Sequence, residues 1–562
     1  MNEMQRYQDW RRHATADPDL MAELEAMAAN PAAIEDAFYR DLAFGTGGLR
    51  GTIGAGTNRM NVYTVAKASQ GLADYIVANF APAARSIAVS RDSRHKSDLF
   101  AEVAARVFAA NGITVWRYEQ IAPTPMLSFA TRQLHCAAGI MVTASHNPAK
   151  YNGYKVYGPD GCQITTAAAK TILDCIERLA IFDDVKMLPL ADAEQAGLIR
   201  AIPASVFDDF VAAVHGTSQL AAGTAIDRAV SIVYSPINGT GLVPVTRTLR
   251  EAGFTDLFVV PEQEQPDGDF PTCPFPNPEI EAAMALGIQY AKARGAELVL
   301  ANDPDCDRVG TAVREADGSY RLLSGNEMGM LLLDYICARR VENGTMPAQP
   351  ELVKTIVTID MADRIAAHYG VTTVNLLTGF KFIGEEIGRL EAAGREADYL
   401  FGFEESYGYL SGTYVRDKDG VNASFLICEM FAYYKTRGIT LAARLAALYR
   451  DYGYCLNTLH SYEFDGAAGF AKMQTIMATF REGVAEFGGE RVASVADYLP
   501  GLDGLPQADV LKFTLATTGS VVVRPSGTEP KLKVYVSVSA ADQPAAAARE
   551  AAIVAGLGGY FA

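Results

Sequence analysis

Apolar residues along this chain alternate between helix-spaced repeats and short continuous runs. After the first 60 residues the pattern predicts helices and strands in turn: a helix over residues 65–80, a strand at 87–89, a helix from 97 to 112 and a strand at 113–116. Ser97 is the predicted N-cap of the second helix, and Gly112 marks its predicted end. Repeated strand-helix units of this kind are typical of an α/β domain.

The same alternation continues in two further units and then changes. The second unit has predicted strands at 229–234, 257–260 and 297–301 and a helix near 279–293. In the third, strands are predicted near 352–358, 372–376 and 399–403. The tail contains the apolar runs Val521–Val523 and Leu532–Val536 and then an alanine-rich helix, which together indicate an α+β unit.

These patterns predict an α/β protein with three successive similar mixed α/β domains and a smaller C-terminal α+β domain around a central cleft. Residues 1–40 are rich in Ala, Glu, Met and Arg and are predicted to form a helical extension. Residues 45–56 contain six glycines and are predicted to be a loop rather than a helix or strand. The predicted domains span residues 41–204, 205–320, 321–452 and 453–562.

Composition narrows the class of protein. The 562 residues carry 49 Lys and Arg against 66 Asp and Glu, a net charge of −17. An acidic surface argues against nucleic acid or an anionic membrane as the main partner. The eight cysteines form no Cys-x-x-Cys pair, and neither a signal peptide nor a membrane-spanning run is found, so we expect a reduced cytoplasmic protein. The sequence predicts no particular oligomeric state.

Residues 143–148, Thr-Ala-Ser-His-Asn-Pro, follow an apolar run that suits a buried strand. Asn147-Pro148 favours a turn, so Ser145 is expected on a sharp loop at a strand end. A serine hydroxyl is a poor nucleophile without a base or a metal, and the Gly-x-Ser-x-Gly elbow of hydrolases is absent. A lone serine of this kind is usually an ordinary loop residue. Three other polar loops make a phosphate carrier the better interpretation.

The second loop is Asn302-Asp303-Pro304-Asp305-Cys306-Asp307-Arg308, directly after an apolar strand. Three carboxylates so close together need a cation, and oxygen ligands favour Mg²⁺ or Ca²⁺. The glycine and the later glutamate of an EF-hand are missing. An Asp-rich turn can also be a solvated loop, but the end of an α/β strand is where such sites usually lie.

The third loop, Gly402-Phe403-Glu404-Glu405-Ser406-Tyr407-Gly408, offers carboxylates and a hydroxyl that suit adjacent sugar hydroxyls. By itself it could be an exposed acidic turn. The fourth, residues 524–533, reads Arg-Pro-Ser-Gly-Thr-Glu-Pro-Lys-Leu-Lys between two strands. An arginine fork with hydroxyl and backbone N–H groups forms a cradle for a phosphate dianion.

In this order the four loops resemble those of the α-D-phosphohexomutase family, which includes phosphoglucomutases and phosphomannomutases. The resemblance spans about residues 40–540. It implies that Ser145 is phosphorylated and donates the phosphate to a sugar hydroxyl, with Lys155 beside the transferring group. It also implies that the Ser145 phosphate and the carboxylates of Asp303, Asp305 and Asp307 hold one Mg²⁺.

The resemblance assigns further contacts. Arg50 in Phe44–Gly51 and Arg308 would contact the active-site phosphate. Glu404, Ser406, Lys418 and the Thr378-Gly379 loop would contact the sugar, and Arg524, Ser526, Gly527 and Thr528 would bind the phosphate that is not being transferred. The Glu-Glu-Ser form looks like that of phosphoglucomutases. One departure is Tyr414, where some phosphoglucomutases have a histidine, so a proton-transfer role for that position is in doubt.

The resemblance thus implies reversible conversion of α-D-glucose 1-phosphate and glucose 6-phosphate through a hexose 1,6-bisphosphate, with sugar phosphates as the partners. Lys155 is a candidate base if burial and a neighbouring cation lower its pKa. Because Ser145 and Arg524 lie in distant parts of the chain, the sequence predicts closure between domains. The alternatives are a phosphomannomutase or phosphopentomutase, a metal-dependent phosphatase, and an inactive sugar-phosphate-binding homologue.

Overall fold

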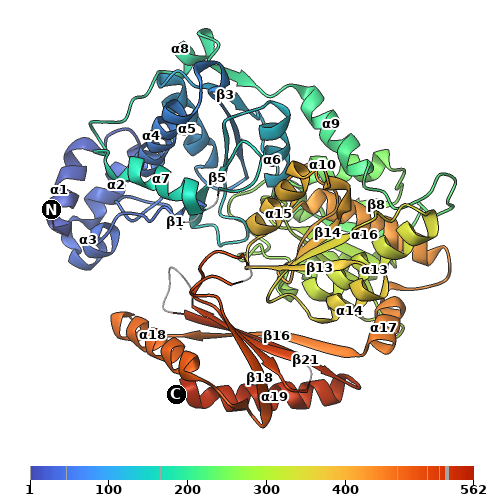
Figure 1. The fold of residues 1–562 in the computed structure, drawn as a ribbon. Coiled ribbons are helices and arrows are strands. Elements are labelled where there is room, and N and C mark those ends of the chain that lie inside the picture. The colour runs from blue at the N-terminus through green and yellow to red at the C-terminus, as the bar shows by residue number, and fades with distance from the viewer. Residues whose placement is uncertain are drawn as a thin grey trace.

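Four β-sheets follow one another along the chain, with helices packed against each of them (Figure 1). The computed structural model describes residues 2–45, 47–164, 166–464, 466–502, 504–517, 519–525 and 531–561. The first three sheets mix parallel and antiparallel strands, and the fourth is antiparallel throughout. The predicted class, three mixed α/β units and a C-terminal α+β unit, is confirmed; the domain boundaries stay predictions.

The first sheet has the order β1-β5-β4-β2-β3-β6, and β5 pairs antiparallel with both of its neighbours, β1 and β4. Ile87 and Val89 point into one core, whereas Ala88 between them packs in another with Leu127, so both faces of β2 are covered by helices. The strands are β1 (Gly48–Thr52), β2 (Ser86–Arg91), β3 (Thr114–Arg117), β4 (Ala138–Val142), β5 (Tyr151–Tyr157) and β6 (Ile199–Ala201). The helices are α4 (Val62–Asn79), η2 (Pro82–Ala84), α5 (Ser97–Ala110), α6 (Thr124–Gln133), α7 (Thr166–Glu177), α8 (Leu190–Gln195) and α9 (Ala204–His215).

The second sheet has the order β11-β10-β9-β7-β8, parallel at β9-β7-β8 and antiparallel at β10 and β11. Its elements are β7 (Ile232–Ser235), α10 (Leu242–Glu251), β8 (Leu257–Val259), α11 (Pro261–Glu264), α12 (Glu281–Arg294), β9 (Leu298–Asn302), β10 (Val309–Arg314) and β11 (Tyr320–Leu323).

The third sheet has the order β13-β12-β14-β15, with only β15 antiparallel. Its elements are α13 (Gly325–Asn343), β12 (Glu351–Thr355), α14 (Met361–His368), β13 (Thr372–Leu376), α15 (Phe380–Ala392), η3 (Glu396–Asp398), β14 (Tyr399–Glu404), β15 (Gly408–Leu410), α16 (Gly420–Lys435) and α17 (Leu441–Tyr452).

The C-terminal unit is one antiparallel sheet with its own core, and it lies below the other three in Figure 1. A separate apolar cluster joins it to the third unit, where Ile356, Val357 and Leu377 pack with Val522 and Tyr535. Its elements are β16 (Tyr454–Glu463), α18 (Gly466–Glu482), β17 (Glu486–Phe487), β18 (Glu490–Asp497), β19 (Leu511–Leu515), β20 (Gly519–Pro525), β21 (Lys531–Ala540) and α19 (Gln543–Phe561).

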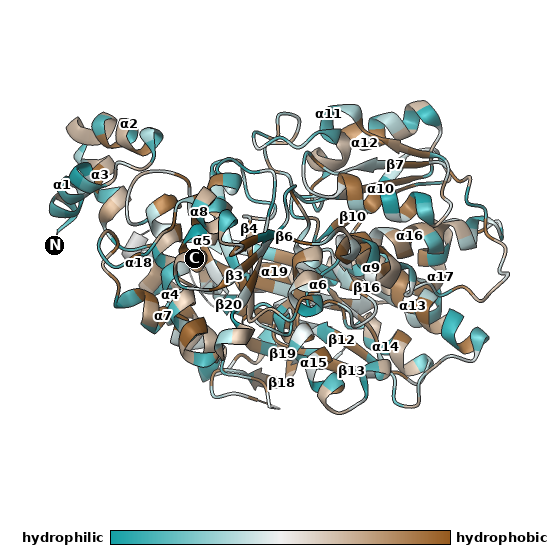
Figure 2. Ribbon diagram, turned by 90° about the horizontal axis from the view of Figure 1, so that it is seen from above, coloured by the Kyte–Doolittle hydropathy of each residue, from teal (hydrophilic) through white to brown (hydrophobic). Residues whose placement is uncertain are grey.

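The predicted helical extension is present and stands at one end of the molecule in Figure 2. It consists of α1 (Glu3–His13), α2 (Pro18–Ala26), η1 (Met27–Ala29) and α3 (Pro31–Phe38). The buried rings of Trp10 and Phe38 meet edge to face and belong to the core of the first unit. Glu23 accepts a hydrogen bond of 2.5 Å from the backbone N–H of Ala55 and so ties the extension to the loop after β1.

Each mixed sheet contains an antiparallel pair of sequential strands that is joined by one of the predicted polar loops. The connections β4–β5, β9–β10 and β14–β15 carry Ser145, the Asp303–Asp307 turn and the Glu404–Tyr407 turn. Each connection contains one non-glycine residue at positive φ: Ser145 (52°), Cys306 (52°) and Tyr407 (65°). The three units therefore share a structural repeat that the sequence does not reveal.

Two local predictions are wrong. Residues 48–52 form β1 rather than a loop, paired antiparallel with β5. The glycines permit this pairing, because a Cβ at Gly48 would lie 1.8 Å from the carbonyl oxygen of Tyr154. Ser97 is not the N-cap of α5; that position is Lys96, and the Ser97 hydroxyl donates to Asp92 Oδ1 instead (2.8 Å).

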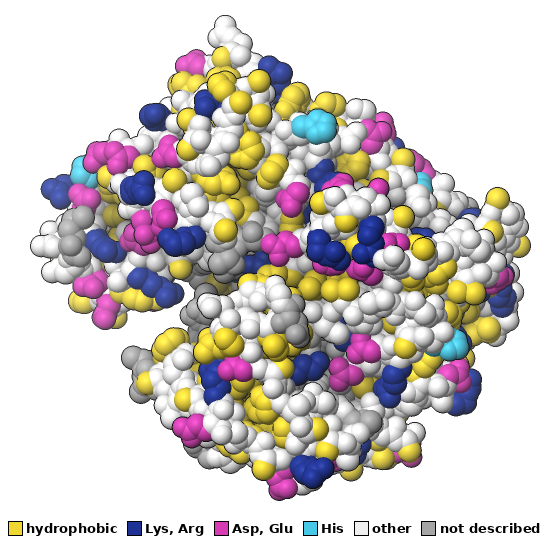
Figure 3. All heavy atoms as spheres, in the orientation of Figure 1, with side chains coloured by type: hydrophobic (Ala, Val, Ile, Leu, Met, Phe, Trp, Pro, Cys, Tyr) yellow, Lys and Arg dark blue, Asp and Glu magenta, His cyan; other side chains and the backbone are white. Residues whose placement is uncertain are grey.

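On the face shown in Figure 3, a hollow at the left lies between the C-terminal unit and the first unit. Charged side chains of both signs are spread over this face rather than gathered by sign. Among the described residues, no helix is both long and apolar enough to cross a membrane. All eight cysteines are free thiols.

Candidate active site

Ser145 lies at the turn between β4 and β5 and is only 3% exposed. Its backbone is in the left-handed region (φ 52°), and its N–H donates to Thr143 Oγ1 at 2.8 Å. Its hydroxyl donates to Asp303 Oδ2 at 2.7 Å and lies 3.2 Å from His146 Nδ1. The expected serine is therefore directed at the expected acidic loop, across 158 residues of sequence.

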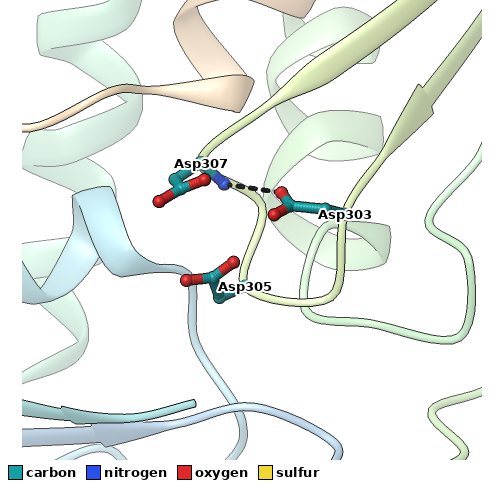
Figure 4. Close-up of side chains that lie close together, drawn as sticks. All are labelled: Asp303, Asp305 and Asp307. Atoms are coloured by element: carbon teal, nitrogen blue, oxygen red, sulfur yellow. Dashed lines mark hydrogen bonds between the residues drawn. The ribbon is translucent and has the colours of Figure 1, made fainter. Parts of the chain in front are cut away.

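Asp303, Asp305 and Asp307 point toward one another from the β9–β10 turn (Figure 4). All three are buried, and one oxygen of each lies within 4.8 Å of those of the other two. Asp303 Oδ1 accepts the backbone N–H groups of Asp307 (3.2 Å) and Arg308 (3.0 Å). In the described part of the chain, Asp305 Oδ1 and Asp307 Oδ1 have no hydrogen-bond partner. The set of oxygens fits a hard divalent cation.

Two lysines form ion pairs with this cluster and offset part of its negative charge. Lys155 Nζ lies 2.7 Å from Asp305 Oδ2 and 3.3 Å from Asp307 Oδ2, and Lys418 Nζ lies 3.3 Å from Asp307 Oδ2. Burial and its acidic neighbours raise the pKa of Asp303. For Asp305 burial acts in the same direction, but the nearby Lys155 ammonium outweighs it and the pKa is lowered.

The expectation of a lowered pKa for Lys155 is wrong in this arrangement. Burial does disfavour the ammonium, but the carboxylates of Asp305 and Asp307 outweigh it and the pKa is raised. Lys155 is thus held as a cation, which suits binding of an anionic group better than removal of a proton.

The two predicted arginines reach the same place from different sheets. Arg50 lies on β1 opposite Gly153, two residues before Lys155 on β5, and its Nη1 lies 3.4 Å from Asn147 Oδ1 in the Ser145 loop. Arg308 follows the acidic turn and donates to Glu279 Oε1 at 2.5 Å. Cations from two units therefore lie around Ser145.

The third loop brings its predicted residues together. Glu404 is buried, and its Oε1 accepts the N–H of Gly379 at 2.9 Å. Thr378 Oγ1 is buried without a hydrogen-bond partner among the described residues. Ser406 is half-buried at the β14–β15 turn. Burial raises the pKa of Glu404, against the charges of Lys418 and Arg308, which lower it.

Arg524 reaches this group from the C-terminal unit. It is half-buried near the end of β20, and β20 pairs it with Lys533 of β21. Burial and the neighbouring Glu404 raise the pKa of Glu405 to about 7, and the charge of Arg524 opposes this rise across the units. The other predicted phosphate contacts, Ser526, Gly527 and Thr528, lie outside the described residues.

Tyr414 belongs to a core rather than to this group. Its hydroxyl donates to Asp419 Oδ2 at 2.7 Å, and its ring meets Phe129 and Phe210 edge to face. A proton-transfer role at this position, already in doubt from the sequence, has no support in these contacts.

Two contributors were missed by sequence reasoning. Thr124, at the start of α6, donates its hydroxyl to Asp305 Oδ2 (2.9 Å) and its N–H to the Asp305 carbonyl (3.0 Å). Arg94 donates to backbone carbonyls of the Ser145 loop. The charged segment Arg-Asp-Ser-Arg at 91–94 follows the strand predicted at 87–89, and this position near a strand end is a sequence signal for such a contributor.

A buried serine, a group of carboxylates able to hold a metal ion and surrounding cations are typical of an enzyme of phosphoryl transfer. Family models of phosphoglucomutase/phosphomannomutase match the chain in order: the α/β/α domains I, II and III at residues 41–180, 208–318 and 324–452, and the C-terminal domain at 471–556. The chain belongs to the phosphoglucomutase/phosphomannomutase family.

A phosphoglucomutase of Staphylococcus epidermidis is 35% identical over 510 residues, which cover 89% of this chain and 91% of that protein. Two solved structures share the fold. A phosphoglucomutase from Paramecium in its open form has a TM-score of 0.68 and 18% identity over 93% of this chain and 95% of its own. A phosphoglucomutase/phosphomannomutase family protein from Burkholderia thailandensis has a TM-score of 0.67 and 19% identity over 92% and 97%.

Proposed function

We propose that this enzyme is a phosphoglucomutase that interconverts α-D-glucose 1-phosphate and glucose 6-phosphate. The observation that carries the proposal is the 2.7 Å contact of the Ser145 hydroxyl with Asp303, in a carboxylate group where two buried oxygens have no hydrogen-bond partner among the described residues. A hydrolase would need a base to activate the serine. His146 Nδ1 does lie 3.2 Å from the Ser145 hydroxyl, but the hydroxyl donates to Asp303 in the proposed cation site, which favours a phosphate carrier. Relatives with 35% identity over most of the chain favour glucose phosphates as substrates.

In the proposed reaction the phosphoserine at 145 gives its phosphoryl group to the free hydroxyl of a bound sugar monophosphate. The Oγ–P bond breaks, a sugar O–P bond forms, and the proton of the sugar hydroxyl ends on Ser145 Oγ. A hexose 1,6-bisphosphate results, turns over in the cleft and returns its other phosphate to Ser145. The sugar is then bound in two orientations by the same set of residues.

The proposed cofactor is Mg²⁺, held by Asp303, Asp305, Asp307 and an oxygen of the Ser145 phosphate. When bound, it would neutralise charge on the oxygens of the transferring group. Lys155 and Arg50 flank Ser145 from β5 and β1, so they are proposed to bind the same group. The raised pKa keeps Lys155 charged for this role.

The remaining proposed roles divide between the sugar and its second phosphate. Arg308 would add charge near the reacting phosphate. The sugar would be held by Thr378, Gly379, Glu404, Ser406 and Lys418, and the distal phosphate by Arg524 with Ser526, Gly527 and Thr528. In support, Glu404 is buried, and Lys418 is half-buried with its Nζ 3.3 Å from Asp307 Oδ2. The charge of Arg524 acts on Glu405, which follows Glu404 in the same loop. A cytoplasmic location stays a prediction.

A substrate panel tests the proposal. Glucose 1-phosphate, mannose 1-phosphate and ribose 1-phosphate are each assayed with Mg²⁺ and a trace of glucose 1,6-bisphosphate, with Ser145→Ala as the inactive control. Highest turnover on glucose 1-phosphate, dependent on the bisphosphate, is the expected result. Release of inorganic phosphate in step with substrate loss would instead identify a phosphatase, and preference for another sugar would identify one of the related mutases.

A further inference from the structure

We propose that Arg94 is a positioning residue that fixes the Ser145 loop against the acidic turn, an inference that rests on the proposed function. The Arg94 side chain is fully buried. Its Nη1 donates to the carbonyl oxygens of Pro148 (3.0 Å) and Tyr151 (3.1 Å), and its Nη2 to those of Ser145 (2.5 Å) and Asn147. One guanidinium thus gathers four carbonyls of a seven-residue loop.

The loop needs such a partner because of its shape. A residue other than glycine at positive φ is strained, and Ser145 is held at 52°. The turn directs backbone carbonyls inward, where each would cost free energy without a hydrogen bond. The planar fork of an arginine can serve several of them at fixed angles, whereas a lysine ammonium is a point donor on a flexible stem.

A second set of contacts holds Arg94 itself. Its Nε lies 3.2 Å from Asp92 Oδ2, and both side chains are fully buried. The same carboxylate oxygen accepts the hydroxyl of Thr143 (2.6 Å), and Thr143 Oγ1 accepts the N–H of Ser145 (2.8 Å). Arg94, Asp92, Thr143 and Ser145 therefore close a ring, so a shift of the arginine moves both sides of the serine.

The other face of Arg94 leads to the acidic turn in the second unit. The ring of Phe270 lies 5.1 Å from its guanidinium carbon. Gly268 packs so closely that a Cβ there would lie 2.8 Å from the N of His95. This segment is joined to the 235–241 loop, because the N–H of Asp267 donates to the carbonyl of Asn238 (3.0 Å).

That loop in turn supports the acidic turn directly. The N–H of Thr240 donates to the carbonyl of Pro304 at 2.8 Å, and its hydroxyl donates to the same oxygen at 3.0 Å. A continuous path of contacts thus runs from the carbonyl of Ser145 through Arg94 to the residue between Asp303 and Asp305. Arg94 sets the distance between the phosphate carrier and the proposed metal ligands without lying among the groups that react.

The test compares Arg94→Lys with Arg106→Lys. Arg106 is a matched control in the same unit, because its Nε also donates to a backbone carbonyl, that of Leu188 (2.9 Å). Each variant is measured for melting temperature, for kcat and KM with glucose 1-phosphate, and for amide hydrogen exchange of the peptide that contains Ser145. For Arg94→Lys we expect kcat to fall about 100-fold, KM to change less than about threefold, and exchange to accelerate. Arg106→Lys should resemble the wild type in all three.

A folded Arg94→Lys enzyme that keeps both wild-type kcat and wild-type exchange overturns the proposal. If that variant does not fold, Asp92→Asn replaces it, and kcat is expected to fall about tenfold at unchanged KM. A folded Asp92→Asn enzyme with wild-type kcat would also overturn the proposal. The exchange measurement tests the role of Arg94 separately from the proposed mutase function. A wild-type enzyme without mutase turnover contradicts the proposed function, yet faster exchange in Arg94→Lys alone would still establish Arg94 as the support of the loop.

Discussion

Buried oxygens without partners are the most informative atoms of this protein. Asp305 Oδ1 and Asp307 Oδ1 are buried in the acidic turn and make no hydrogen bond within the described chain. Buried polar atoms are nearly always paired, so such oxygens point to a ligand. Their second oxygens are bound by Lys155, which leaves one lone-pair direction of each side chain for a cation.

Removing one of these oxygens should weaken metal binding specifically. For Asp305→Asn we expect Mg²⁺ affinity to fall about tenfold or more, because a neutral amide replaces a charged ligand. Titration calorimetry and the Mg²⁺ dependence of turnover measure this. Asp256→Asn, on the exposed side chain that pairs with Arg294, is the control and should leave both unchanged. Equal Mg²⁺ affinity in the two variants would contradict the assignment.

Asp419 gives a prediction about pH. Burial raises its pKa to about 6, although hydrogen bonds from Tyr414 and from the N–H of Asn422 oppose the rise. Since the unfolded value is about 3.9, the folded state binds the extra proton, and stability falls as pH rises from about 4 to 7. Asp419→Asn removes this titration. As pH rises over that interval, the free energy of unfolding of Asp419→Asn should therefore increase relative to that of the wild type by roughly 2–3 kcal/mol.

Urea unfolding of both proteins at several pH values between about 4 and 7.5 measures the difference. A difference between Asp419→Asn and the wild type that stays constant over these pH values would show that the Asp419 carboxyl does not titrate in the interval.

At the residue scale, the sequence predicted which side chains gather but not what supports them. Ser145 and the three aspartates lie in motifs whose residue types announce their chemistry. Arg94 works through backbone carbonyls, and no motif records which carbonyls a distant arginine will meet. The pKa of Lys155 was wrongly expected to fall, because the sequence gives no distance to Asp305 and Asp307.

At the element scale, a recurrent antiparallel strand pair explains how one architecture provides three different polar loops. In each mixed sheet, a buried strand (β4, β9 or β14) turns back through a connection with one non-glycine residue in the left-handed region: Ser145, Cys306 or Tyr407. Such a turn reverses the chain at the end of a strand, where α/β sites lie. The serine, the aspartates and the glutamate thus occupy equivalent places in three units.

β1 depends on glycine for its place beside β5. Gly48→Ala should destabilise the protein by at least about 2 kcal/mol, because the residue sits at φ 135° and a Cβ would lie 1.8 Å from the Tyr154 carbonyl oxygen. Activity should fall too, since Arg50 lies two residues on. Gly388→Ala, in α15 with no atom within 4 Å of the added Cβ, is the control. It should be neutral or stabilising by up to about 1 kcal/mol. Similar chemical denaturation midpoints for the two variants would contradict the role of Gly48.

β1 also shows why some strands could be predicted from the sequence and others could not. Most strands of the first three units are apolar runs that periodicity detects. β1 reads Gly-Leu-Arg-Gly-Thr and has the composition of a loop. Its pairing is decided by close backbone contact with β5, about 100 residues away, and no local pattern records that contact.

On the scale of the whole molecule, cations from separate units are directed at the same polar loops despite a net charge of −17. Arg50 and Lys155 of the first sheet and Lys418 of the third unit act on the acidic turn, whereas Arg524 of the C-terminal sheet acts on Glu405. The order of the units and the distant pairing of their loops could be predicted from motif order. The apolar cluster of Ile356, Val357 and Tyr535 that joins the C-terminal unit to the third unit could not.

The hollow between the C-terminal unit and the first unit leads to a prediction of closure (Figure 3). A ligand with phosphate at both ends would be held by Arg524 at one end and by the Ser145 group at the other, which draws the units together. Small-angle scattering should give a smaller radius of gyration with glucose 1,6-bisphosphate and Mg²⁺ than without them. Arg524→Met should lose this change, and an unchanged radius in the wild type would contradict closure.

The most direct test of the account follows the phosphoryl group itself. The enzyme is incubated with Mg²⁺ and glucose 1,6-bisphosphate that carries ³²P, and peptide mass spectrometry locates the label. The account predicts phosphate on Ser145, its transfer to added glucose 1-phosphate at the rate of turnover, and no labelled protein for Ser145→Ala. Turnover of glucose 1-phosphate with no label ever on Ser145 would contradict it.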